Sequence, residues 1–509
     1  MSLHWKILLG MGLGILAGVG LQFGVAGGSS AGFTTVADGG FLRVASVAAD
    51  GPAAGRLAPG DRLAGALGPD GAPASAADGA EALSAWVAAF EHGQKIQFRR
   101  VDGSTVEVAL ELDADSPRSR ILAPVRAAAD IFMRLLRMLI VPLILTSIVN
   151  GVAGIAGGRE FGRLGTKTLA YYIGSSFLAI CVGLVVINAF RPGVGAQLGL
   201  AVPDSFAPGE GRSFFDILQR MVPPNVFEAL ADNGQMLQVI VFALLLGFFI
   251  GRAHPPHRER MAGLFESGFE VMMAVAGFVL KLIPIGVFAL MAKVVGETGL
   301  GIFRPLLAYM LVVTLGLLFH AGVVLPALLY FLGRINPLRW FQAVSPAVLT
   351  ALSTSSSSVT LPVTMEAVEK RGGVSNKIGS FTLPLGATVN MDGTALYECV
   401  GVIFLSQYYA SQGGFELSFG VQLFVVVTAL LASIGAAGIP SAGLVMMLAI
   451  LQALGLPIEG AALLLAIDRP LDMLRTGVNV WSDTCAAALI GKSEGDRVLG
   501  AARAAAAGG

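Results

Sequence analysis

Long apolar stretches separated by short polar segments make up most of this chain. Because a membrane-spanning helix needs about 20 mostly apolar residues, each stretch of roughly this length is a candidate span. The candidates are residues 5–23, 121–155, 168–190, 234–251, 264–295, 303–333, 377–409 and 457–491. The pattern predicts an all-α polytopic membrane protein with eight transmembrane helices.

Two further apolar stretches, at residues 345–371 and 418–454, are interrupted in the middle. The first is broken by the polar run Ser353–Ser358, and the second by the Gly- and Pro-containing run Gly435–Ser441. Two short apolar arms around such a tip predict a re-entrant helical hairpin, because irregular backbone is tolerated at membrane depth only where it lines protein or a cavity. Paired interrupted segments in a transporter-like chain also point to the binding site.

Residues 24–120 have a different pattern, which is typical of a small soluble α+β domain. Leu42–Val47 predicts a strand, while Ile96–Arg100 and Thr105–Leu112 predict two paired strands around Asp102-Gly103, a strong hairpin signal. Apolar residues at helical spacing predict one helix between these strands: Leu83, Trp86, Val87 and Phe90. A segment of about ninety residues can enclose a small core of its own.

This segment resembles a PDZ domain. The resemblance rests on Gly39–Leu42 before the first predicted strand, on Gly51–Ala54 and Pro59–Asp61, and on the later helix and hairpin. It implies a domain over residues 33–115 that binds an extended peptide as an added strand, with the terminal carboxylate of the peptide held by glycine-loop amides. The alternative is that these glycines form only a turn.

Basic residues in short loops predict the orientation, because cytoplasmic loops carry an excess of Lys and Arg. Lys6 precedes the first span, and other basic residues follow the second and fourth spans: Arg159, Arg163, Lys167, Arg252, Arg258 and Arg260. The N-terminus is therefore expected in the cytoplasm and residues 24–120 outside. Leu8–Phe23 is interpreted as a retained helix, and not as a cleavable signal peptide, because it is nearly long enough to span and many spans follow.

Composition supports a membrane protein. Of the 509 residues, 55% are hydrophobic and 13% are charged, whereas about a quarter of the residues of a soluble protein are charged. A formal net charge of zero gives no support for a nucleic-acid partner. Cys181, Cys399 and Cys485 lie in apolar stretches, so no structural disulfide is expected. The absence of a His-Glu-x-x-His motif gives no support for a zinc protease.

The last apolar stretch carries polar residues that are costly inside a membrane and are therefore functional candidates. They are Asp468, Arg469, Asp472, Arg475, Asn479 and Asp483. All but Arg469 recur every three or four residues, which places them on one stripe of a helix. Such a stripe requires a cavity or partner charges. The alternative is a structural ion-pair network, such as Asp472 with Arg475.

The preceding span contains Asn390–Thr394, followed by Glu398. Asn and Gly weaken a helix and free backbone carbonyls, and these carbonyls together with a buried carboxylate are oxygen ligands suited to Na⁺ in an unwound helix. The segment alone could be a packing kink. Together with the polar stripe and the two broken hairpins, it predicts a cation site.

Four motifs in this order resemble the glutamate transporter family, the dicarboxylate/amino acid:cation symporters. They are Ser355–Pro362, Asn390–Tyr397, the segment from Ser433 to Gly443, and Asp472–Thr476 with Asn479 and Asp483. The resemblance covers residues 1–23 and 121–495, and the PDZ-like insertion between the first two spans is its main departure from the family.

The resemblance implies a fold of eight spans and two re-entrant hairpins, assembled as a homotrimer in the lipid bilayer. Spans 1, 2, 4 and 5 would form a scaffold, and spans 3, 6, 7 and 8 with both hairpins would form a transport domain that moves like an elevator. The expected organisation along the chain is a first helix at 1–23, a scaffold-rich half at 121–300, a transport core at 301–495 and a disordered tail at 496–509. The plasma membrane, the inner membrane of a bacterium, is the expected location.

The resemblance also implies residue roles in binding an acidic amino acid. The expected substrate site comprises Ser356, Ser357, Ser358, Thr394, Gly438, Asp472, Arg475, Thr476 and Asn479. Asp472 would bind the amino group and Arg475 the side-chain carboxylate, in keeping with the fit of a guanidinium to a carboxylate. Neutral amino-acid relatives lack the arginine and dicarboxylate relatives lack the acid, so glutamate or aspartate is favoured.

For cotransported Na⁺, the resemblance implies three sites. The first comprises Gly386, Asn390, Asn479 and Asp483, and the second comprises carbonyl groups of Thr388, Ser433, Ile434 and Ala436. The third comprises Tyr172, Ser175, Ser176, Asn390 and Asp392. Ser175 and Ala436 stand where the family commonly has Thr.

Glu398 is the candidate carrier of a cotransported proton, because a carboxyl group in a low-dielectric pocket favours its neutral form. Proton-coupled animal relatives have Glu at this position, and some archaeal relatives have Gln. The family usually has an arginine near the substrate at one of two positions, which are occupied here by Ser355 and Met473. Arg469, about one turn before Met473, is a candidate replacement for it.

Three alternative functions remain open at this point. A proton-driven dicarboxylate or neutral amino-acid symporter would keep the fold and change the cargo. A membrane protease would need a base near Ser441, and no His or Lys stands at a suggestive position. A peptide-binding membrane sensor would use the outer domain and leave the transporter part silent, although the intact cation-site residues argue against this.

Overall fold

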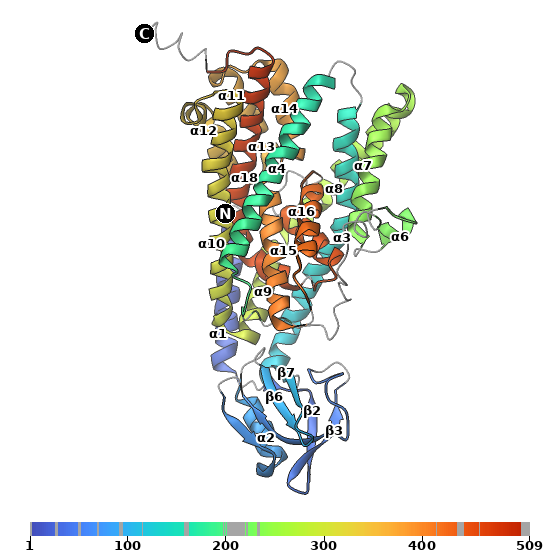
Figure 1. Cartoon of the computed structure of the whole chain (residues 1–509), viewed down its shortest axis with the longest axis vertical. Helices are drawn as coiled ribbons and strands as arrows, with labels where there is room; N and C mark the ends of the chain where they lie inside the picture. The colour runs from blue at the N-terminus through green and yellow to red at the C-terminus, as the bar shows by residue number, and fades with distance from the viewer. Residues whose placement is uncertain are drawn as a thin grey trace. The chain divides into compact units, whose positions relative to one another are not determined.

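The computed structural model divides into two compact units (Figure 1). Unit 1 contains Met1–Met133, Ala196–Asp204 and Lys281–Pro305, and unit 2 contains Arg134–Gly195, Ser205–Leu280 and Leu306–Gly509. The structure describes residues 3–25, 29–48, 52–68, 71–90, 95–113, 116–156, 162–196, 198, 200, 219, 222–231, 235–413, 415–434, 442–457 and 459–499.

In unit 1, helix α1 (Leu3–Gly24) packs along α9 (Ile283–Thr298). Gly10, Gly14 and Gly18 recur every four residues on the face of α1 that meets α9. A Cβ atom at Gly14 would lie 2.5 Å from the carbonyl oxygen of Phe288. Small residues at this spacing let two apolar helices approach closely, which explains the richness in glycine of the first predicted span.

Replacing Gly14 with leucine is expected to destabilise the protein by about 1–3 kcal/mol, the usual cost of overpacking a close contact. Gly12→Leu is the matched control, because a Cβ atom at Gly12 meets nothing within 4 Å. Thermal unfolding in detergent should show a lower midpoint for the Gly14 variant alone. Equal midpoints for the two variants would contradict the proposed packing.

The inserted domain forms a sheet with strand order β2-β3-β4-β6-β7, and β5 pairs with the side of β4. Its elements are β2 (Phe33–Asp38), β3 (Phe41–Val47), β4 (Arg62–Leu67), β5 (Pro73–Ser75), the 3₁₀ turn η1 (Ala76–Asp78), helix α2 (Ala80–Ala88), β6 (Lys95–Arg100) and β7 (Thr105–Ala109). Leu42, Leu63 and Phe98 from the sheet and Leu83 and Val87 from α2 share one buried core. The strands predicted at 42–47 and 96–100 and the helix around Leu83 are confirmed, and the strand predicted at 105–112 is confirmed as far as Ala109, whereas Glu111–Leu112 form a separate strand that pairs elsewhere. Strands β2, β4 and β5 were not predicted.

The two glycines before β3 form a turn. Gly39 and Gly40 both have positive φ angles and connect β2 to β3, with Asp38 paired to Phe41. This is the two-residue hairpin for which glycine is suited. Because β3 is hydrogen-bonded to β2 on one side and to β4 on the other, these glycines do not precede a free strand edge. The turn alternative from the sequence therefore fits this geometry better than a carboxylate-binding loop.

The turn between β6 and β7 follows the predicted Asp102-Gly103 signal. Gly103 has a φ of 86°, and Asp102 Oδ1 accepts hydrogen bonds from Ser104 N at 2.8 Å and Ser104 Oγ at 2.6 Å. These hydrogen bonds stabilise the ionised carboxyl group and lower the pKa of Asp102.

A short two-stranded stem brings the ends of the insertion together. Strand β1 (Ser29–Ser30) pairs antiparallel with β8 (Glu111–Leu112). Just beyond the stem, Arg118 at the start of α3 (Pro117–Ala156) donates hydrogen bonds to the carbonyl oxygens of Gln22 (2.6 Å) and Val25 (3.0 Å). A guanidinium group is well suited to unpaired carbonyls at the end of a helix, here α1. The insertion therefore leaves and rejoins the helices of unit 1 at one place.

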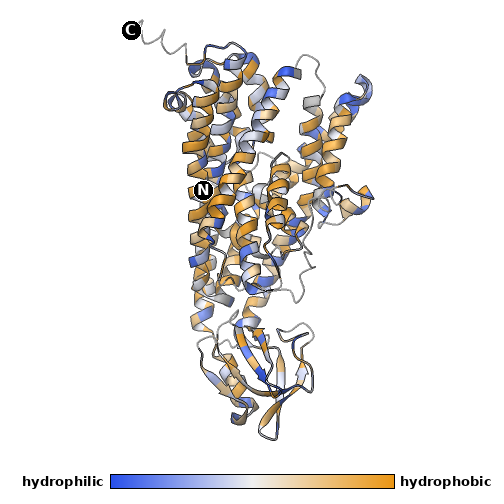
Figure 2. Ribbon diagram, viewed as in Figure 1, coloured by the Kyte–Doolittle hydropathy of each residue, from blue (hydrophilic) through white to orange (hydrophobic). Residues whose placement is uncertain are grey.

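The remaining helices are mostly apolar along their length (Figure 2). They are α4 (Gly162–Phe190), α6 (Val226–Ala231), α7 (Met236–Arg252), α8 (Pro255–Lys281), the 3₁₀ turn η3 (Leu300–Ile302), α10 (Phe303–Phe319), the π-helical turn η4 (His320–Val324), α11 (Leu325–Gly333), α12 (Pro337–Thr354), α13 (Ser357–Glu366), the π-helical turn η5 (Ala367–Arg371), α14 (Asn376–Val389), α15 (Asp392–Gln412), α16 (Phe419–Ile434), α17 (Ala442–Ala453) and α18 (Glu459–Ser493). Among the described residues, four segments are long and apolar enough to cross a membrane: Pro117–Ala153, Arg163–Phe190, Pro255–Val279 and Leu300–Gly333.

Three predicted stretches are divided in the structure. The stretch 264–295 is split between α8 and α9, with Pro284 in the first turn of α9, a position where the missing N–H of proline costs nothing. The stretch 377–409 is split between α14 and α15 at Asn390-Met391. The stretch 345–371 is split between α12 and α13 at Ser355, whose φ of 51° ends α12. The tip of the other interrupted stretch, residues 435–441, lies outside the described residues.

The chain beyond α18 folds back on unit 2. Asp496 Oδ2 accepts hydrogen bonds from Ser375 N (2.8 Å) and Ser375 Oγ (2.9 Å) at the start of α14, and Leu499 N donates to the carbonyl oxygen of Gly372 (2.8 Å). The tail predicted to be disordered from residue 496 thus begins with an ordered segment, and its remainder lies outside the described residues. Glu494 accepts a hydrogen bond from Lys167 at 2.6 Å, which lowers the pKa of this carboxyl group.

Candidate functional site

The candidate site lies in unit 2, where the break between α14 and α15 faces α18. Asn390 ends α14, and Met391 precedes α15 with a non-helical φ of −114° and ψ of 53°. Gly393 is required here, because a Cβ atom would lie 2.5 Å from the carbonyl oxygen of Arg475. The Asn-Met-Asp-Gly-Thr segment therefore places its side chains directly against the polar stripe of α18.

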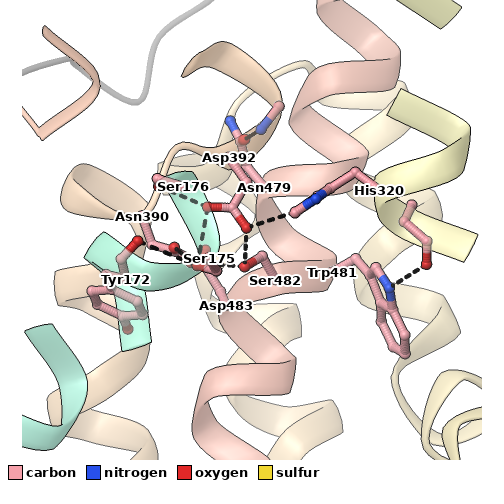
Figure 3. Close-up of polar contacts among 12 residues, drawn as sticks. Tyr172, Ser175, Ser176, His320, Asn390, Asp392, Asn479, Trp481, Ser482 and Asp483 are labelled. Atoms are coloured by element: carbon pink, nitrogen blue, oxygen red, sulfur yellow. Dashed lines mark hydrogen bonds and ion pairs between the residues drawn. The ribbon is translucent and has the colours of Figure 1, made fainter. Parts of the chain in front are cut away.

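Asp392 is the centre of a buried polar cluster (Figure 3). Its Oδ1 accepts hydrogen bonds from Ser176 Oγ (2.7 Å) and Ser175 Oγ (3.1 Å) on α4. Its Oδ2 accepts a hydrogen bond from Ser482 Oγ on α18 (2.7 Å) and lies 3.0 Å from His320 Nε2. Both side chains of the Asp392–His320 pair are fully buried. Four polar groups from three helical segments therefore hold one carboxylate inside an apolar bundle.

Asn390 links this cluster to Asp483. Its amide nitrogen donates hydrogen bonds to Asp483 Oδ1 (2.9 Å) and Ser482 Oγ (3.0 Å), and its oxygen accepts one from Ser175 Oγ (3.2 Å). Gly386 makes room for the cluster, because a Cβ atom there would overlap the carboxylate of Asp483. Tyr172 lies at the left of the cluster in Figure 3 and donates a hydrogen bond to the carbonyl oxygen of Thr382 (2.7 Å).

The oxygen atoms in this cluster are of the kind that bind hard cations. Hydroxyl, amide and carboxylate oxygens surround Asp392 and Asp483, and both carboxylates are buried. Oxygen ligands of this kind suit hard cations, whereas transition metals favour imidazole and thiolate groups. Within the described part of the chain, no three His, Cys, Asp or Glu side chains form a group suited to a metal ion.

A second buried cluster lies about three turns earlier on α18. Asp472 Oδ1 accepts hydrogen bonds from Arg475 Nη2 (2.7 Å) and Nε (3.1 Å), and Asp472 Oδ2 accepts one from Arg469 Nη1 (2.8 Å). Arg475 Nη1 also lies 3.1 Å from Asp468 Oδ1. The guanidinium of Arg475 lies over the ring of Tyr397, 4.2 Å from its centroid, a distance at which a cation–π attraction is significant.

Residues between the two clusters connect them. Asn479 Oδ1 accepts a hydrogen bond from Gly393 N (2.7 Å), and Asn479 Nδ2 donates one to Thr394 Oγ1 (3.2 Å). Thr476 donates from its hydroxyl to the carbonyl oxygen of Asp472 (2.7 Å). At Gly443 near the start of α17, a Cβ atom would lie 2.9 Å from Thr394 Cγ2 and 3.1 Å from Arg475 Nη1. One arm of the second interrupted segment therefore lies against the arginine.

The first interrupted segment supplies serines at the start of a helix. Ser356 is the N-cap of α13 and accepts a hydrogen bond from Val359 N (3.3 Å). Ser356 and Ser357 are buried, whereas Ser358 is exposed. The N-terminus of a helix favours a bound anion because free N–H groups and the helix dipole point at it. The arm before the tip packs on α18, since a Cβ atom at Gly477 would lie 2.8 Å from Leu352 Cδ2.

The carbonyl site predicted for a second cation is only partly described. Thr388 lies in the last turn of α14 and Ser433 and Ile434 in the last turn of α16, where helix carbonyls have no partner within their own helix. Ala436 and the predicted substrate residue Gly438 lie outside the described residues.

Glu398 lies on α15, one turn beyond Thr394, and is fully buried. Within the described part of the chain, neither of its carboxyl oxygens has a hydrogen-bond partner. An ionised carboxylate without partners in an apolar surrounding is very costly, so this environment favours a protonated Glu398.

Sequence reasoning missed two residues of the Asp392 cluster, His320 and Ser482. Ser482 lies seven residues after Arg475, or about two turns, so the polar stripe of α18 already included its position. His320 is a titratable residue inside an apolar stretch, which is itself a signal of function. The π-helical turn η4 that begins at His320 is a feature often found at functional sites.

These observations define a multi-pass helical membrane protein with two adjacent buried polar clusters, one suited to a cation and one to a charged solute. The sequence pattern of the Sodium:dicarboxylate symporter family matches residues 109–493. The chain is 35% identical over 421 residues to the provisionally named sodium-dependent excitatory amino acid transporter glt-4 of Caenorhabditis elegans, covering 73% of this chain and 83% of that protein.

Two further transporters are similar to the chain over most of its length. Excitatory amino acid transporter 2 of Homo sapiens is 33% identical over 429 residues, covering 72% of this chain and 74% of the relative. The proton/glutamate-aspartate symporter of Escherichia coli is 32% identical over 414 residues, covering 80% of this chain and 93% of the relative. The chain therefore belongs to the sodium:dicarboxylate symporter family, and the family resemblance predicted from the sequence is confirmed.

Proposed function

We propose that this protein is a secondary active symporter that imports L-glutamate or L-aspartate together with Na⁺, with a proton as a candidate further cosubstrate. The observation that carries the proposal is the buried pairing of Asp472 with Arg475 beside the Asp392 cluster. An acidic amino acid carries an ammonium and a side-chain carboxylate, and these need an acid and an arginine in a site closed to water. The relatives named for glutamate, aspartate or excitatory amino acids support the same cargo.

In this proposal Asp472 binds the substrate ammonium and Arg475 the side-chain carboxylate. Ser356, Ser357 and Ser358 at the start of α13, with Asn479, bind the α-carboxylate, where the helix N-terminus favours an anion. Thr394, Thr476 and Gly438 line the remaining surface. The proximity of Thr394 and Gly443 to Arg475 supports a pocket enclosed by α15, α17 and α18.

Three cotransported Na⁺ ions are proposed to bind near this pocket. One would bind at Asp392 with Tyr172, Ser175, Ser176 and Asn390, to which the structure adds Ser482 as a candidate ligand. A second would bind at Asp483 with Gly386, Asn390 and Asn479. A third would bind the carbonyl groups of Thr388, Ser433, Ile434 and Ala436. Asn390 belongs to the first two of these cation sites and would couple them to each other. Asn479 belongs to a cation site and to the substrate site, and would couple cation binding to substrate binding.

The proposed architecture has eight spans and two re-entrant hairpins, and three copies of the chain form the transporter. Spans 3, 6, 7 and 8 with both hairpins would move as one transport domain against a trimeric scaffold. The plasma membrane, the inner membrane of a bacterium, is the proposed location, with the inserted domain outside. The contacts that α4 makes with α15, α16 and α18 support the grouping of the third span with the transport domain.

Na⁺-dependent thermal stabilisation tests the binding site. L-aspartate or L-glutamate with Na⁺ should raise the unfolding midpoint of the purified protein, whereas succinate and L-serine should have much smaller effects. Stabilisation by succinate alone would instead favour a dicarboxylate carrier, and stabilisation by L-serine alone a neutral amino-acid carrier.

Glu398→Gln is expected to remove the pH dependence of substrate uptake, because glutamine imitates the protonated acid but cannot release a proton. Uptake by the unaltered protein should fall as pH rises above the range in which Glu398 is protonated, and the variant should lose this response. Initial uptake rates across a pH series in proteoliposomes provide the measurement. The same pH response in both proteins would exclude Glu398 as the proton carrier.

For the inserted domain, over residues 33–115, we propose a PDZ-like fold that binds an extended peptide by strand addition, with the role of the peptide C-terminus as the point to test. The peptide would add to β2, which lies at the edge of the sheet and beside α2, since an exposed strand edge is the usual site of β-strand addition. Binding of labelled peptides with free and amidated C-termini to the full-length protein tests this. Equal binding by a variant lacking residues 29–112 would refute it.

A further inference from the structure

Both carboxylate oxygens of Asp472 are already held by arginine side chains in the structure. Arg475 donates to Oδ1 through Nη2 and Nε, and Arg469 donates to Oδ2 through Nη1 at 2.8 Å. Arg475 is in turn shared with Asp468, whose Oδ1 lies 3.1 Å from Nη1. The group proposed to bind the substrate ammonium and the group proposed to bind the substrate carboxylate are therefore both occupied by side chains of the same helix.

The helix geometry of α18 favours this arrangement. Asp472 lies three residues from both arginines, and Asp468 lies two turns before Arg475, spacings that bring side chains together on one helix face. The four side chains are at most 7% exposed. Their formal charges sum to zero, with two carboxylates and two guanidinium groups. Such a set is electrically neutral without any bound ion or solute.

The chemistry of the two outer members imitates that of the proposed substrate. Arg469 places a cation on Asp472, as a substrate ammonium would, and Asp468 places a carboxylate on Arg475, as a substrate side chain would. We propose that Asp468 and Arg469 are internal counterions that take the places of the substrate carboxylate and ammonium when the site is empty. This inference rests on the proposed function of Asp472 and Arg475.

Substrate binding then becomes an exchange of ion pairs. The incoming ammonium displaces Arg469 from Asp472, and the incoming side-chain carboxylate displaces Asp468 from Arg475. Tyr397 supports the exchange, because its ring contacts the face of the Arg475 guanidinium. The N–H donors on the edge of the guanidinium can therefore change partners while this contact is kept. The arginine therefore keeps one favourable contact throughout.

The exchange has a consequence for the return of the empty carrier. A buried charge without a partner is strongly unfavourable, so a transport domain that moves without substrate needs its acid and arginine paired. Asp468 and Arg469 provide that pairing. They also compete with the substrate, because only the fraction of sites with the internal pairs open can bind it.

The test compares two transport modes in proteoliposomes under one inward Na⁺ gradient. Exchange is measured with unlabelled L-aspartate inside, and net uptake with no substrate inside, so that only net uptake requires the empty carrier to return. Asp468→Asn is expected to raise the apparent affinity for L-aspartate by about 10-fold, because its competition is removed. Exchange should be retained, and net uptake should fall by about 10-fold or more.

Arg469→Gln should give the same split between exchange and net uptake. The double variant Asp468→Asn/Arg469→Gln removes one charge of each sign and keeps the cluster neutral. It provides the same test if a single variant fails to fold. Asp468→Glu should restore most of the net uptake, and Glu366→Gln, at an exposed site on α13, serves as the charge-matched control with unaltered transport.

An equal loss of exchange and net uptake would overturn the proposal and assign these residues a structural role. A lower apparent affinity for L-aspartate would also overturn it, by showing that they bind the substrate directly. Unchanged transport in the single and double variants would exclude any part in the cycle. Absence of exchange in the unaltered protein would instead refute the proposed function.

Discussion

Asp392→Asn is expected to abolish Na⁺-driven uptake of acidic amino acids while leaving the fold intact. Asparagine has nearly the same shape, and its oxygen can still accept the hydrogen bonds of Ser175 and Ser176 that Asp392 Oδ1 accepts. Its amide nitrogen can donate toward Ser482 and His320, but the negative charge is lost. Loss of one partner from a buried charge pair commonly costs about 3–5 kcal/mol, so Na⁺ affinity should fall by about 100-fold or more.

Na⁺ titration of the unfolding midpoint provides the measurement, with uptake in proteoliposomes alongside. Ser482→Ala serves as the graded comparison, because it removes the hydroxyl that donates to Asp392 and accepts from Asn390 without changing the charge of the cluster, and it should weaken Na⁺ binding by only about 10-fold. Na⁺ affinity and uptake that are unchanged in Asp392→Asn would show that this carboxylate does not bind the cation.

Arg475→Cys is expected to change the substrate class. The variant should lose about 100-fold or more in affinity for L-aspartate, because removing one partner of a buried, hydrogen-bonded charge pair costs about 2–5 kcal/mol. Asp472 retains Arg469 as a partner, so an ammonium site remains. Neutral amino acids such as L-serine should then bind in a Na⁺-dependent manner.

Competition between labelled L-aspartate and unlabelled L-serine measures this change in selectivity. Arg339→Gln, at an exposed position on α12, is the matched control and should preserve the preference for L-aspartate. If Arg475→Cys continues to bind L-aspartate as tightly as the unaltered protein, the side-chain carboxylate is recognised elsewhere.

Much of the helical framework follows from the spacing of apolar residues. The predicted span at 303–333 agrees with the continuous segment formed by η3, α10, η4 and α11, and the serine run marks the break between α12 and α13. Breaks inside apolar stretches were harder to predict. The end of α14 at Asn390 depends on contacts with α18, and strand β4 depends on pairing with β6, which follows it only after α2.

The polar stripe on the last helix predicted the right face of α18, because helical spacing fixes which side chains share a face. It could not predict which charges pair. Arg469 lies off the strict spacing and nevertheless contacts Asp472, since a long arginine side chain reaches across about one turn. His320 reaches Asp392 from η4 through a contact 72 residues apart in sequence, which local pattern does not reveal.

Uptake of labelled L-aspartate into proteoliposomes under separately imposed Na⁺ and proton gradients is the most direct test of the proposed function. The inward Na⁺ gradient alone should drive accumulation above the external concentration, a simultaneous inward proton gradient should increase it, and excess unlabelled L-glutamate should compete. Accumulation driven by the proton gradient in the absence of Na⁺ would contradict the assignment of Asp392 and Asp483 to Na⁺. Absence of accumulation under either gradient would contradict the assignment of this protein as an acidic amino-acid symporter.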